Sequence, residues 1–191
     1  MNVQPDSLQW LPTAYPETFA LTFARRVSAR ELLLRLGCPP DSLTLLTRED
    51  AEEQELEDPD AGHVVRAGEH GSWAWAIQLW GTRILAADVL GAVSAGTEAV
   101  VLVNSSLPWF AYAADGGEVC SFDAGMPHLR YGSDPDRFLP LLAEAGILSG
   151  PDQPGDRPVL AMLRLAELAF SLSLPKDAVE SQETAAGLVG D

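Results

Sequence analysis

The sequence contains little positive charge and almost no lysine. Its 191 residues include 12 Lys plus Arg against 28 Asp plus Glu, which gives a formal net charge of −16 at pH 7. Lys176 is the single lysine, and the other basic residues are arginines. Binding to a polyanion requires clustered cations that release its counterions, so nucleic acid is not expected as a partner. An anionic membrane surface is disfavoured for the same reason.

The sequence has only two cysteines, and it lacks a long apolar run and the pattern of a secretory signal. Cys38 and Cys120 lie too far apart in sequence for a metal knuckle or a redox pair, and they predict two small buried side chains. The longest apolar stretch, 158–174, contains Arg164 and is shorter than the roughly 20 residues that span a bilayer. Residues 1–10 lack the basic and apolar runs of a secretory signal. The sequence therefore predicts a soluble cytoplasmic protein that does not bind membranes.

Hydrophobic periodicity and cap signals predict an α+β fold. Strand patterns lie at 19–23, 63–67, 72–79, 97–104, 108–114 and 117–122. Helix patterns lie at 29–36, 83–93, 134–145 and 159–172. We expect a mostly antiparallel sheet of about five strands with helices packed mainly on one face. The small side of strand 72–79, with Ala74 and Ala76, is expected to pack closely against a helix, and the candidate is the helix predicted at 83–93.

One hairpin register can be predicted. Asp115-Gly116 is typical of a tight turn, because both residues tolerate positive backbone angles. Pairing Ala114 with Gly117 across this turn places Trp109 opposite Phe122. Aromatic cross-strand pairs of this kind contribute about 0.2–1 kcal/mol each.

The chain is predicted to form four consecutive parts. They are an N-terminal arm (1–18), an α+β domain (19–148), a linker with a C-terminal helix packed on the domain (149–174) and a flexible tail (175–191). Trp10 and Tyr15 are expected to anchor the arm to the body. The last helix is apolar on more than one side, so either the rest of the chain covers it or it forms a homodimer contact.

Residues 48–60 concentrate the negative charge. They contain eight acids and one arginine, a net charge of −7. Carboxylates are favourable in a first helical turn, so a helix is expected to begin after Thr47. The segment is either a solvated helix or a surface that attracts a basic protein partner by electrostatic steering. In the second interpretation the contact residues are Glu52, Glu53, Glu55 and Glu57.

The segment 109–134 holds an alternative site. It combines aromatic and polar side chains between a strand and a helix, where loops often carry function. A small-molecule-binding protein or enzyme is predicted to use Trp109, Tyr112, Phe122, Asp123, His128 and Arg130. In the other interpretation Arg130 forms a salt bridge and Asp134 caps the next helix, which only shapes the loop.

No set of residues predicts catalysis or a metal site. Cys120 and His128 resemble a nucleophilic pair, but a cysteine in mid-strand of an acidic protein is expected to have a raised pKa. His63 and His70 have acids nearby, yet their spacing matches no closed zinc pattern. No glycine-rich phosphate loop is present. We therefore expect no catalytic residue, no metal and no cofactor.

Several short motifs occur in an order that resembles a known family. They include Trp10-Leu11, Phe19 to Arg25, Arg35-Leu36-Gly37, Gly71-Ser72-Trp73, Ser94-Ala95-Gly96-Thr97, Phe110 to Gly116, Ser121-Phe122-Asp123 and Glu144-Ala145-Gly146. Over residues 10–148 this order resembles the domain of unknown function family numbered 6461, which is found in actinobacteria. The family is uncharacterised, so the resemblance implies no catalytic residue and no cofactor. The excess of arginine over lysine agrees with a high-GC source.

Charge distribution and the lack of a catalytic set favour a non-enzymatic protein-interaction or regulatory module of an actinobacterial-type cytoplasm. The expected partner is a basic protein that binds the acidic segment 48–60. The alternative is a small-molecule-binding protein or enzyme with an aromatic-lined pocket near 109–134.

Overall fold

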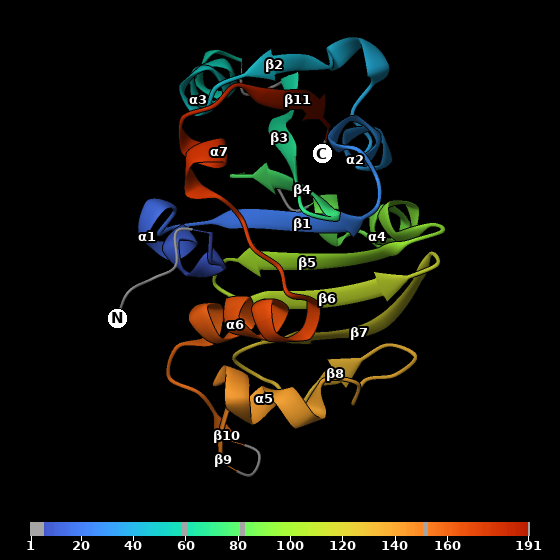
Figure 1. Ribbon diagram of the computed structural model, residues 1–191, viewed down its shortest axis with the longest axis vertical. Coiled ribbons are helices and arrows are strands. Elements are labelled where there is room, and N and C mark those ends of the chain that lie inside the picture. Colours follow the sequence, from blue (N-terminus) through green and yellow to red (C-terminus); the bar gives the residue numbers. More distant parts are fainter. Residues whose placement is uncertain (1–5, 59–60, 81–82, 151–152, 191) are drawn as a thin grey trace.

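The computed structural model describes residues 6–58, 61–80, 83–150 and 153–190. One antiparallel sheet dominates this part of the chain. Its strands are β1 (Phe19–Arg25), β2 (Thr44–Leu46), β3 (His63–His70), β4 (Trp73–Gln78), β5 (Glu98–Asn104), β6 (Trp109–Ala114), β7 (Gly117–Asp123), β8 (Arg130–Tyr131) and β11 (Thr184–Val189). They lie in the order β2-β11-β3-β4-β1-β5-β6-β7-β8, and each strand is antiparallel to its neighbours (Figure 1). β9 (Leu148–Gly150) and β10 (Gln153–Pro154) form a separate hairpin.

Helices lie on both faces of this sheet. They are α1 (Leu11–Ala14), α2 (Ala29–Arg35), α3 (Arg48–Glu57), α4 (Ala87–Ser94), α5 (Leu139–Ala145), α6 (Pro158–Phe170), α7 (Lys176–Glu180) and the short 3-10 helices η1 (Leu8–Trp10), η2 (Pro40–Ser42) and η4 (Arg83–Leu85). α2 and α4 pack on one face, whereas α1, α5, α6 and α7 lie on the other. Within the described ranges, no helix is both long and apolar enough to cross a membrane.

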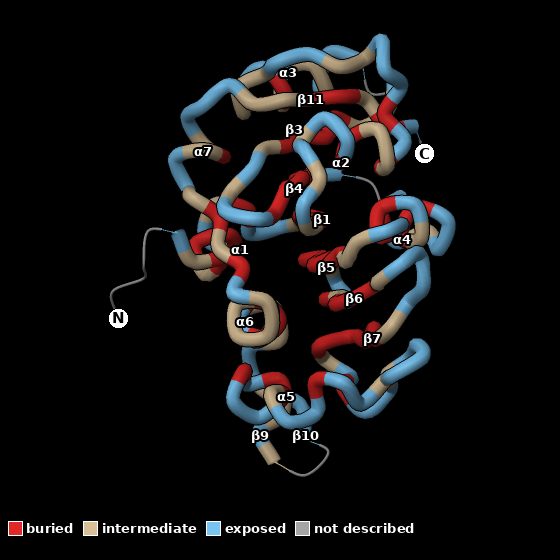
Figure 2. The backbone as a smooth tube through the Cα atoms, turned by 45° about the vertical axis from the view of Figure 1, so that its right-hand side comes forward, coloured by how far each residue is buried: buried red, intermediate tan, exposed pale blue. Residues whose placement is uncertain are grey.

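The two faces of the sheet differ in side-chain size. Phe23, Trp75 and Phe110 are among the large residues on the side of α6, which we call the aromatic face. Ala74 and Ala76 belong to the side of α2 and α4, which we call the alanine face. Figure 2 shows the buried strands between the two helix layers. A helix packs against the small side of β4, as expected, but it is α2 and not the predicted helix 83–93, because α4 lies over β5, β6 and β7.

The predicted fold class is wrong in strand number and in helix placement. The described residues form a sheet of nine strands, not about five, and helices cover both of its faces. The strands that the sequence did not indicate are β2, β8 and β11. β2 and β8 contain three and two residues, which is too short for an alternating pattern to be recognised. Both faces of the central strands are apolar, so both need cover.

The C-terminal residues differ from the predicted flexible tail. Residues 184–189 form β11, which pairs with both β2 and β3. Ala186 is fully buried, and a Cβ added at Gly187 would lie 2.9 Å from the Cβ of Cys38. A strand of small residues carries a weak hydrophobic signal, so its position depends on partners that are distant in sequence.

The β6–β7 hairpin turns where predicted, but its register shifts by one residue. A bulge leaves Val119 without a partner on β6, and beyond it Phe110 pairs with Phe122. The predicted pairing of Trp109 with Phe122 is therefore wrong. The carbonyl oxygen of Val119 instead accepts a hydrogen bond from the Asp134 N–H at 2.9 Å. The extra residue thus redirects a backbone group toward the segment that follows β8.

Two aromatic residues anchor the N-terminal arm, as expected. The Trp10 indole donates a hydrogen bond to the carbonyl oxygen of Leu174 at 3.0 Å. The Tyr15 hydroxyl donates to the Glu180 carboxylate at 2.6 Å. Both contacts tie the arm to the chain around α7. Leu165 of α6 is fully buried within the chain, and a homodimer contact through this helix stays a prediction.

Candidate interaction surface

α3 carries most of the acidic segment and begins with a capping box. The Asp50 N–H donates a hydrogen bond to the Thr47 hydroxyl at 3.1 Å, and the Thr47 N–H donates to the Asp50 carboxylate at 3.1 Å. Hydrogen bonds from the Thr47 side chain and backbone lower the pKa of Asp50. Two backbone donors are satisfied in this way, which starts the helix despite its charge.

α3 packs on the sheet through a single small side chain. Ala51 is its buried residue, and it contacts Val64 of β3 and Ala186 of β11. A methyl group at the contact buries little apolar surface, so packing alone holds this helix weakly. The remaining attachment is ionic.

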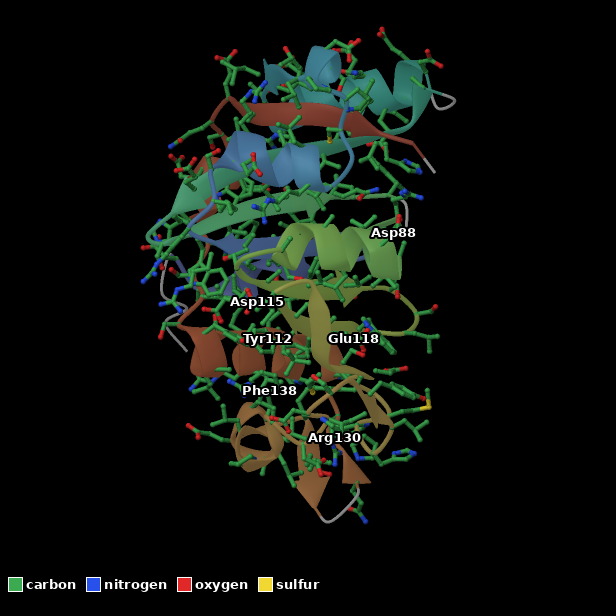
Figure 3. The ribbon with its side chains drawn as sticks, turned by 90° about the vertical axis from the view of Figure 1, so that its right-hand side faces the viewer. Asp88, Tyr112, Asp115, Glu118, Arg130 and Phe138 are labelled. Atoms are coloured by element: carbon green, nitrogen blue, oxygen red, sulfur yellow. The ribbon has the colours of Figure 1, made fainter. Side chains whose placement is uncertain are left out.

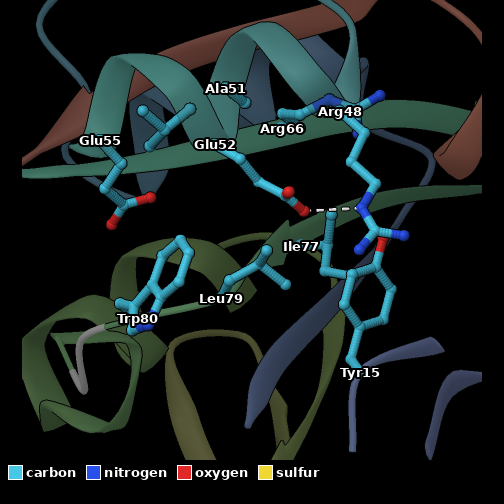
Figure 4. Close-up of a pocket in the computed structure, with 10 residues that line it drawn as sticks. Tyr15, Arg48, Ala51, Glu52, Glu55, Arg66, Ile77, Leu79 and Trp80 are labelled. Carbon is cyan, nitrogen blue, oxygen red and sulfur yellow. Dashed lines mark hydrogen bonds and ion pairs between the residues drawn. The ribbon is translucent and has the colours of Figure 1, made fainter. Parts of the chain in front are cut away.

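The first ionic contact joins α3 to α7 and to the arm. The Arg48 guanidinium pairs with Glu52 at 2.6 Å and with Glu180 at 2.7 Å. It also lies 4.7 Å from the ring centroid of Tyr15, whose hydroxyl binds the same Glu180. Figure 4 shows Arg48 and Glu52 reaching toward each other above Tyr15. Segments more than a hundred residues apart therefore meet at one arginine.

Arg66 of β3 lies beneath this contact and is only 4% exposed. Its guanidinium donates to the carbonyl oxygens of Val179 at 2.8 Å and Gln182 at 3.1 Å. Burial lowers the pKa of Arg66. The pocket that these residues line has a volume of about 20 Å³, enough for about one water molecule. It has no room for an organic ligand.

A second ionic contact lies at the other end of α3. The Glu55 carboxylate pairs with His63 Nδ1 at 2.8 Å. Burial raises the pKa of Glu55, although the hydrogen bond to His63 opposes this. Beside the pair is a hollow of about 260 Å³ that is lined by Glu55, His63, Leu56 and Trp80. Leu56 is 76% and Trp80 41% exposed, so the hollow has an apolar rim open to solvent.

The acids of α3 divide between its two sides. Glu52 and Glu55 turn inward and are paired, as described above. Glu49, Glu53 and Glu57 are exposed and four residues apart, which places them on one side of the helix. Within the described ranges, no cation pairs with these three carboxylates. Four contact residues were predicted in this segment. Of these, Glu53 and Glu57 have exposed side chains without an ion-pair partner among the described residues.

Asp60, the last acid of the predicted segment, lies outside the described residues. Leu56 and Trp80 were missed from the sequence. The signal for Leu56 is its position as the one large apolar residue in an otherwise polar helix. Trp80 gives no such signal, because its exposure depends on how α3 lies over the end of β4.

The structure separates the aromatic residues predicted for the alternative site. Tyr112 and Phe122 belong to the buried core of the aromatic face. Trp109 lies on the alanine face, where its ring is nearly parallel to that of Tyr131 at a centroid distance of 6.4 Å. Three aromatic side chains on opposite faces of a sheet cannot line one pocket.

The polar residues of that site have local partners. The Asp123 carboxylate accepts a hydrogen bond from the Gly125 N–H at 2.7 Å. Arg130 pairs with Asp136 at 2.6 Å, and it also donates to the carbonyl oxygen of Pro127. His128 is exposed. These contacts shape the loop.

The structure does not support the nucleophilic pair of Cys120 and His128 or the metal cluster of His63 and His70 either. Cys120 is fully buried, its thiol donates to the carbonyl oxygen of Pro135 at 3.3 Å, and burial raises its pKa to about 11. His128 is on the surface. His63 and His70 occupy opposite ends of β3, roughly 23 Å apart at the rise of a strand. Among the described residues, no three His, Cys, Asp or Glu side chains group as a metal ion would require.

Comparison with known proteins places the chain in a family. No curated protein and no solved structure matches it. A family model matches residues 1–188, which include the arm and the whole sheet except Val189, the last residue of β11. The resemblance inferred from the motif order over residues 10–148 is thus confirmed and extended to both ends. The chain belongs to the family of unknown function DUF6461.

Proposed function

We propose that this chain is a non-enzymatic protein-interaction module of an actinobacterial-type cytoplasm that binds a basic segment of another protein. The contact is the α3 surface, which we define as Glu49, Glu53, Leu56, Glu57 and Trp80. The observation that carries the proposal is the position of three unpaired carboxylates beside an exposed apolar hollow.

Each part of this surface has a separate role. Carboxylates without an internal partner attract a cationic segment and raise its association rate. An apolar side chain of the partner fills the hollow beside Leu56 and Trp80. In protein interfaces a few buried contacts, often with Trp or Tyr, supply most of the binding free energy, so we expect this contact to hold the partner. The partner is therefore a basic segment that carries one large apolar residue. Cys38 and Cys120 are free thiols, which fits a reducing cytoplasm.

The test uses synthetic basic peptides with and without a central leucine or phenylalanine, titrated against the full chain by fluorescence anisotropy. The variant Glu49→Gln/Glu53→Gln/Glu57→Gln is expected to weaken binding about tenfold, since each rim carboxylate contributes below about 1 kcal/mol. Leu56→Ser should abolish the preference for the apolar residue. Binding should also weaken as salt is added.

The matched control is Glu17→Gln/Glu144→Gln/Asp156→Asn, which removes three exposed carboxylates outside α3 and the strands beside it. It is expected to leave peptide binding nearly unchanged. An equal loss in both triple variants would show that net charge alone attracts the peptides. That result would overturn the assignment to α3.

A further inference from the structure

A second cavity lies on the alanine face, away from the α3 surface. It is a groove of about 280 Å³ between the N-terminal half of α4 and strands β5 and β6. Its walls include Leu85, Leu90 and Trp109, and its floor is Val101 and Ala111. Figure 3 shows α4 crossing the sheet on this side of the molecule.

The groove follows from how α4 is attached. The C-terminal part of the helix is held against the β6–β7 hairpin, where the Gly116 N–H donates to the carbonyl oxygen of Ser94 at 3.2 Å. A Cβ added at Gly91 would lie 3.2 Å from the Gly116 carbonyl oxygen, so the two backbones are in close contact. Toward the other end of α4 the floor residue is Ala111, whose methyl group is too short to fill the space. Val101 and Ala111 are only 1% and 2% exposed, so the apolar surface that the groove offers to a ligand comes mainly from its walls, Leu85, which is 40% exposed, and Trp109.

Glu118 is the one ionisable residue among the described residues that line the groove. Its carboxylate accepts a hydrogen bond from the Ser121 hydroxyl, and Ser121 is itself almost fully buried. That bond occupies one carboxylate oxygen and orients the group. Nearby, Arg83 pairs with Asp88 at 3.4 Å and does not neutralise Glu118. The groove therefore combines an apolar body with a single fixed negative charge.

We propose that this groove binds a small organic cation with an apolar body, such as an alkyl ammonium ion. The ammonium group pairs with Glu118, and the apolar body lies between Leu85 and the Trp109 ring, above the buried floor of Val101 and Ala111. An anionic ligand would be repelled by Glu118, and a neutral one would desolvate the carboxylate without compensation. The groove volume of about 280 Å³ lies just below the usual range of small-molecule pockets, which suits a small ligand such as octylammonium.

This site is independent of the proposed partner surface. α3 packs at the β11–β3 end of the sheet, whereas the groove lies on the opposite face over β5 and β6. Failure of one proposal does not affect the other.

The experiment compares octylammonium, octanol and octanoate, which share one chain and differ in head-group charge. Each is titrated into the full-length protein and followed by calorimetry and by the indole N–H signals in NMR spectra. Octylammonium is expected to bind about tenfold more tightly than octanol, since a charge-assisted hydrogen bond contributes about 1.5–3 kcal/mol. Octanoate is expected to bind more weakly still. Equal affinities for the three probes, or no binding of octylammonium, would overturn the proposal.

Two variants locate the site. Glu118→Gln keeps the shape and the acceptor for Ser121 but removes the charge, and it should reduce octylammonium affinity about tenfold. Glu144→Gln removes an exposed carboxylate elsewhere and should leave the affinity unchanged. Ala111→Leu fills the floor and should abolish binding. If Ala111→Leu does not fold, the comparison of Glu118→Gln with Glu144→Gln still tests the site. An equal loss of octylammonium affinity in these two variants would rule out the groove.

Discussion

Single residues of α3 with the same chemistry have different surroundings. Glu52 and Glu55 face the sheet and pair with Arg48 and His63, whereas Glu53 points to solvent. The sequence predicted all of them as equivalent contact residues, because charge and spacing within a helix do not tell which side is covered. That side is chosen by β3 and α7, which supply the partners.

The raised pKa of Glu55 predicts a pH-dependent contribution to stability. Its folded-state pKa lies above the ordinary value of 4.5 because of burial, so the native state binds more protons between the two values. The contribution of Glu55 is fully present below pH 4.5 and is lost as the pH rises through the folded-state pKa. In urea titrations from acid to neutral pH, Glu55→Gln should therefore gain stability relative to the wild type. Glu53→Gln is the control, and a constant difference for Glu55→Gln would contradict the prediction.

At the level of elements, helix caps were predicted with mixed success. Ser28 caps α2 as its capping motif indicates, since its side chain accepts from the Glu31 N–H at 3.1 Å. Asp134 was expected to start a helix, but α5 begins only at Leu139. The Asp134 carbonyl oxygen accepts a hydrogen bond from the Arg137 N–H at 3.2 Å, and its carboxylate pairs with the Arg137 side chain at 3.6 Å, so a turn follows Asp134 before the helix begins. The cap signal therefore marks a chain reversal here and not the first turn of a helix.

Thr47→Ala should destabilise α3 specifically. Loss of the capping side chain is expected to lower the free energy of unfolding by about 0.5–2 kcal/mol. Because only Ala51 anchors this helix by packing, hydrogen exchange should accelerate most in α3. Thr13→Ala in α1 changes an exposed threonine that is not a cap and should have little effect. Uniform acceleration across the sheet in Thr47→Ala would argue against a local role.

For the whole molecule, the sheet is completed by a strand distant in sequence from its neighbours. β11 lies between β2 and β3, so residues 184–189 join two strands from the first half of the sequence. Tyr15 and Arg48 add contacts to Glu180 just before it. This arrangement makes the region after residue 174 part of the core, where a polar flexible tail was expected.

Removal of β11 should therefore destabilise the entire fold. A chain that ends at Gln182 exposes the edge of β3 and leaves β2 without its neighbour, so we expect aggregation or loss of the cooperative thermal transition. A chain that ends at Val189 keeps the strand and should unfold like the full chain. Both can be compared by circular dichroism and light scattering. A cooperative, monomeric protein ending at Gln182 would contradict this account.

The sequence by itself determined the features that depend on near neighbours. These are the alternation that gives the sheet a large and a small side, the cap of α2, the hairpin turn before Gly117 and the concentration of charge in α3. Tertiary structure decided that β11 inserts between β2 and β3 and that helices cover both faces of the sheet. It also decided which acids of α3 face the sheet or the solvent, and it formed the groove at Glu118. The physical reason is that strand pairing, burial and side-chain contacts join residues that are far apart in sequence, such as Tyr15 and Glu180 at a separation of 165 positions, whereas hydrophobic periodicity reports only local geometry.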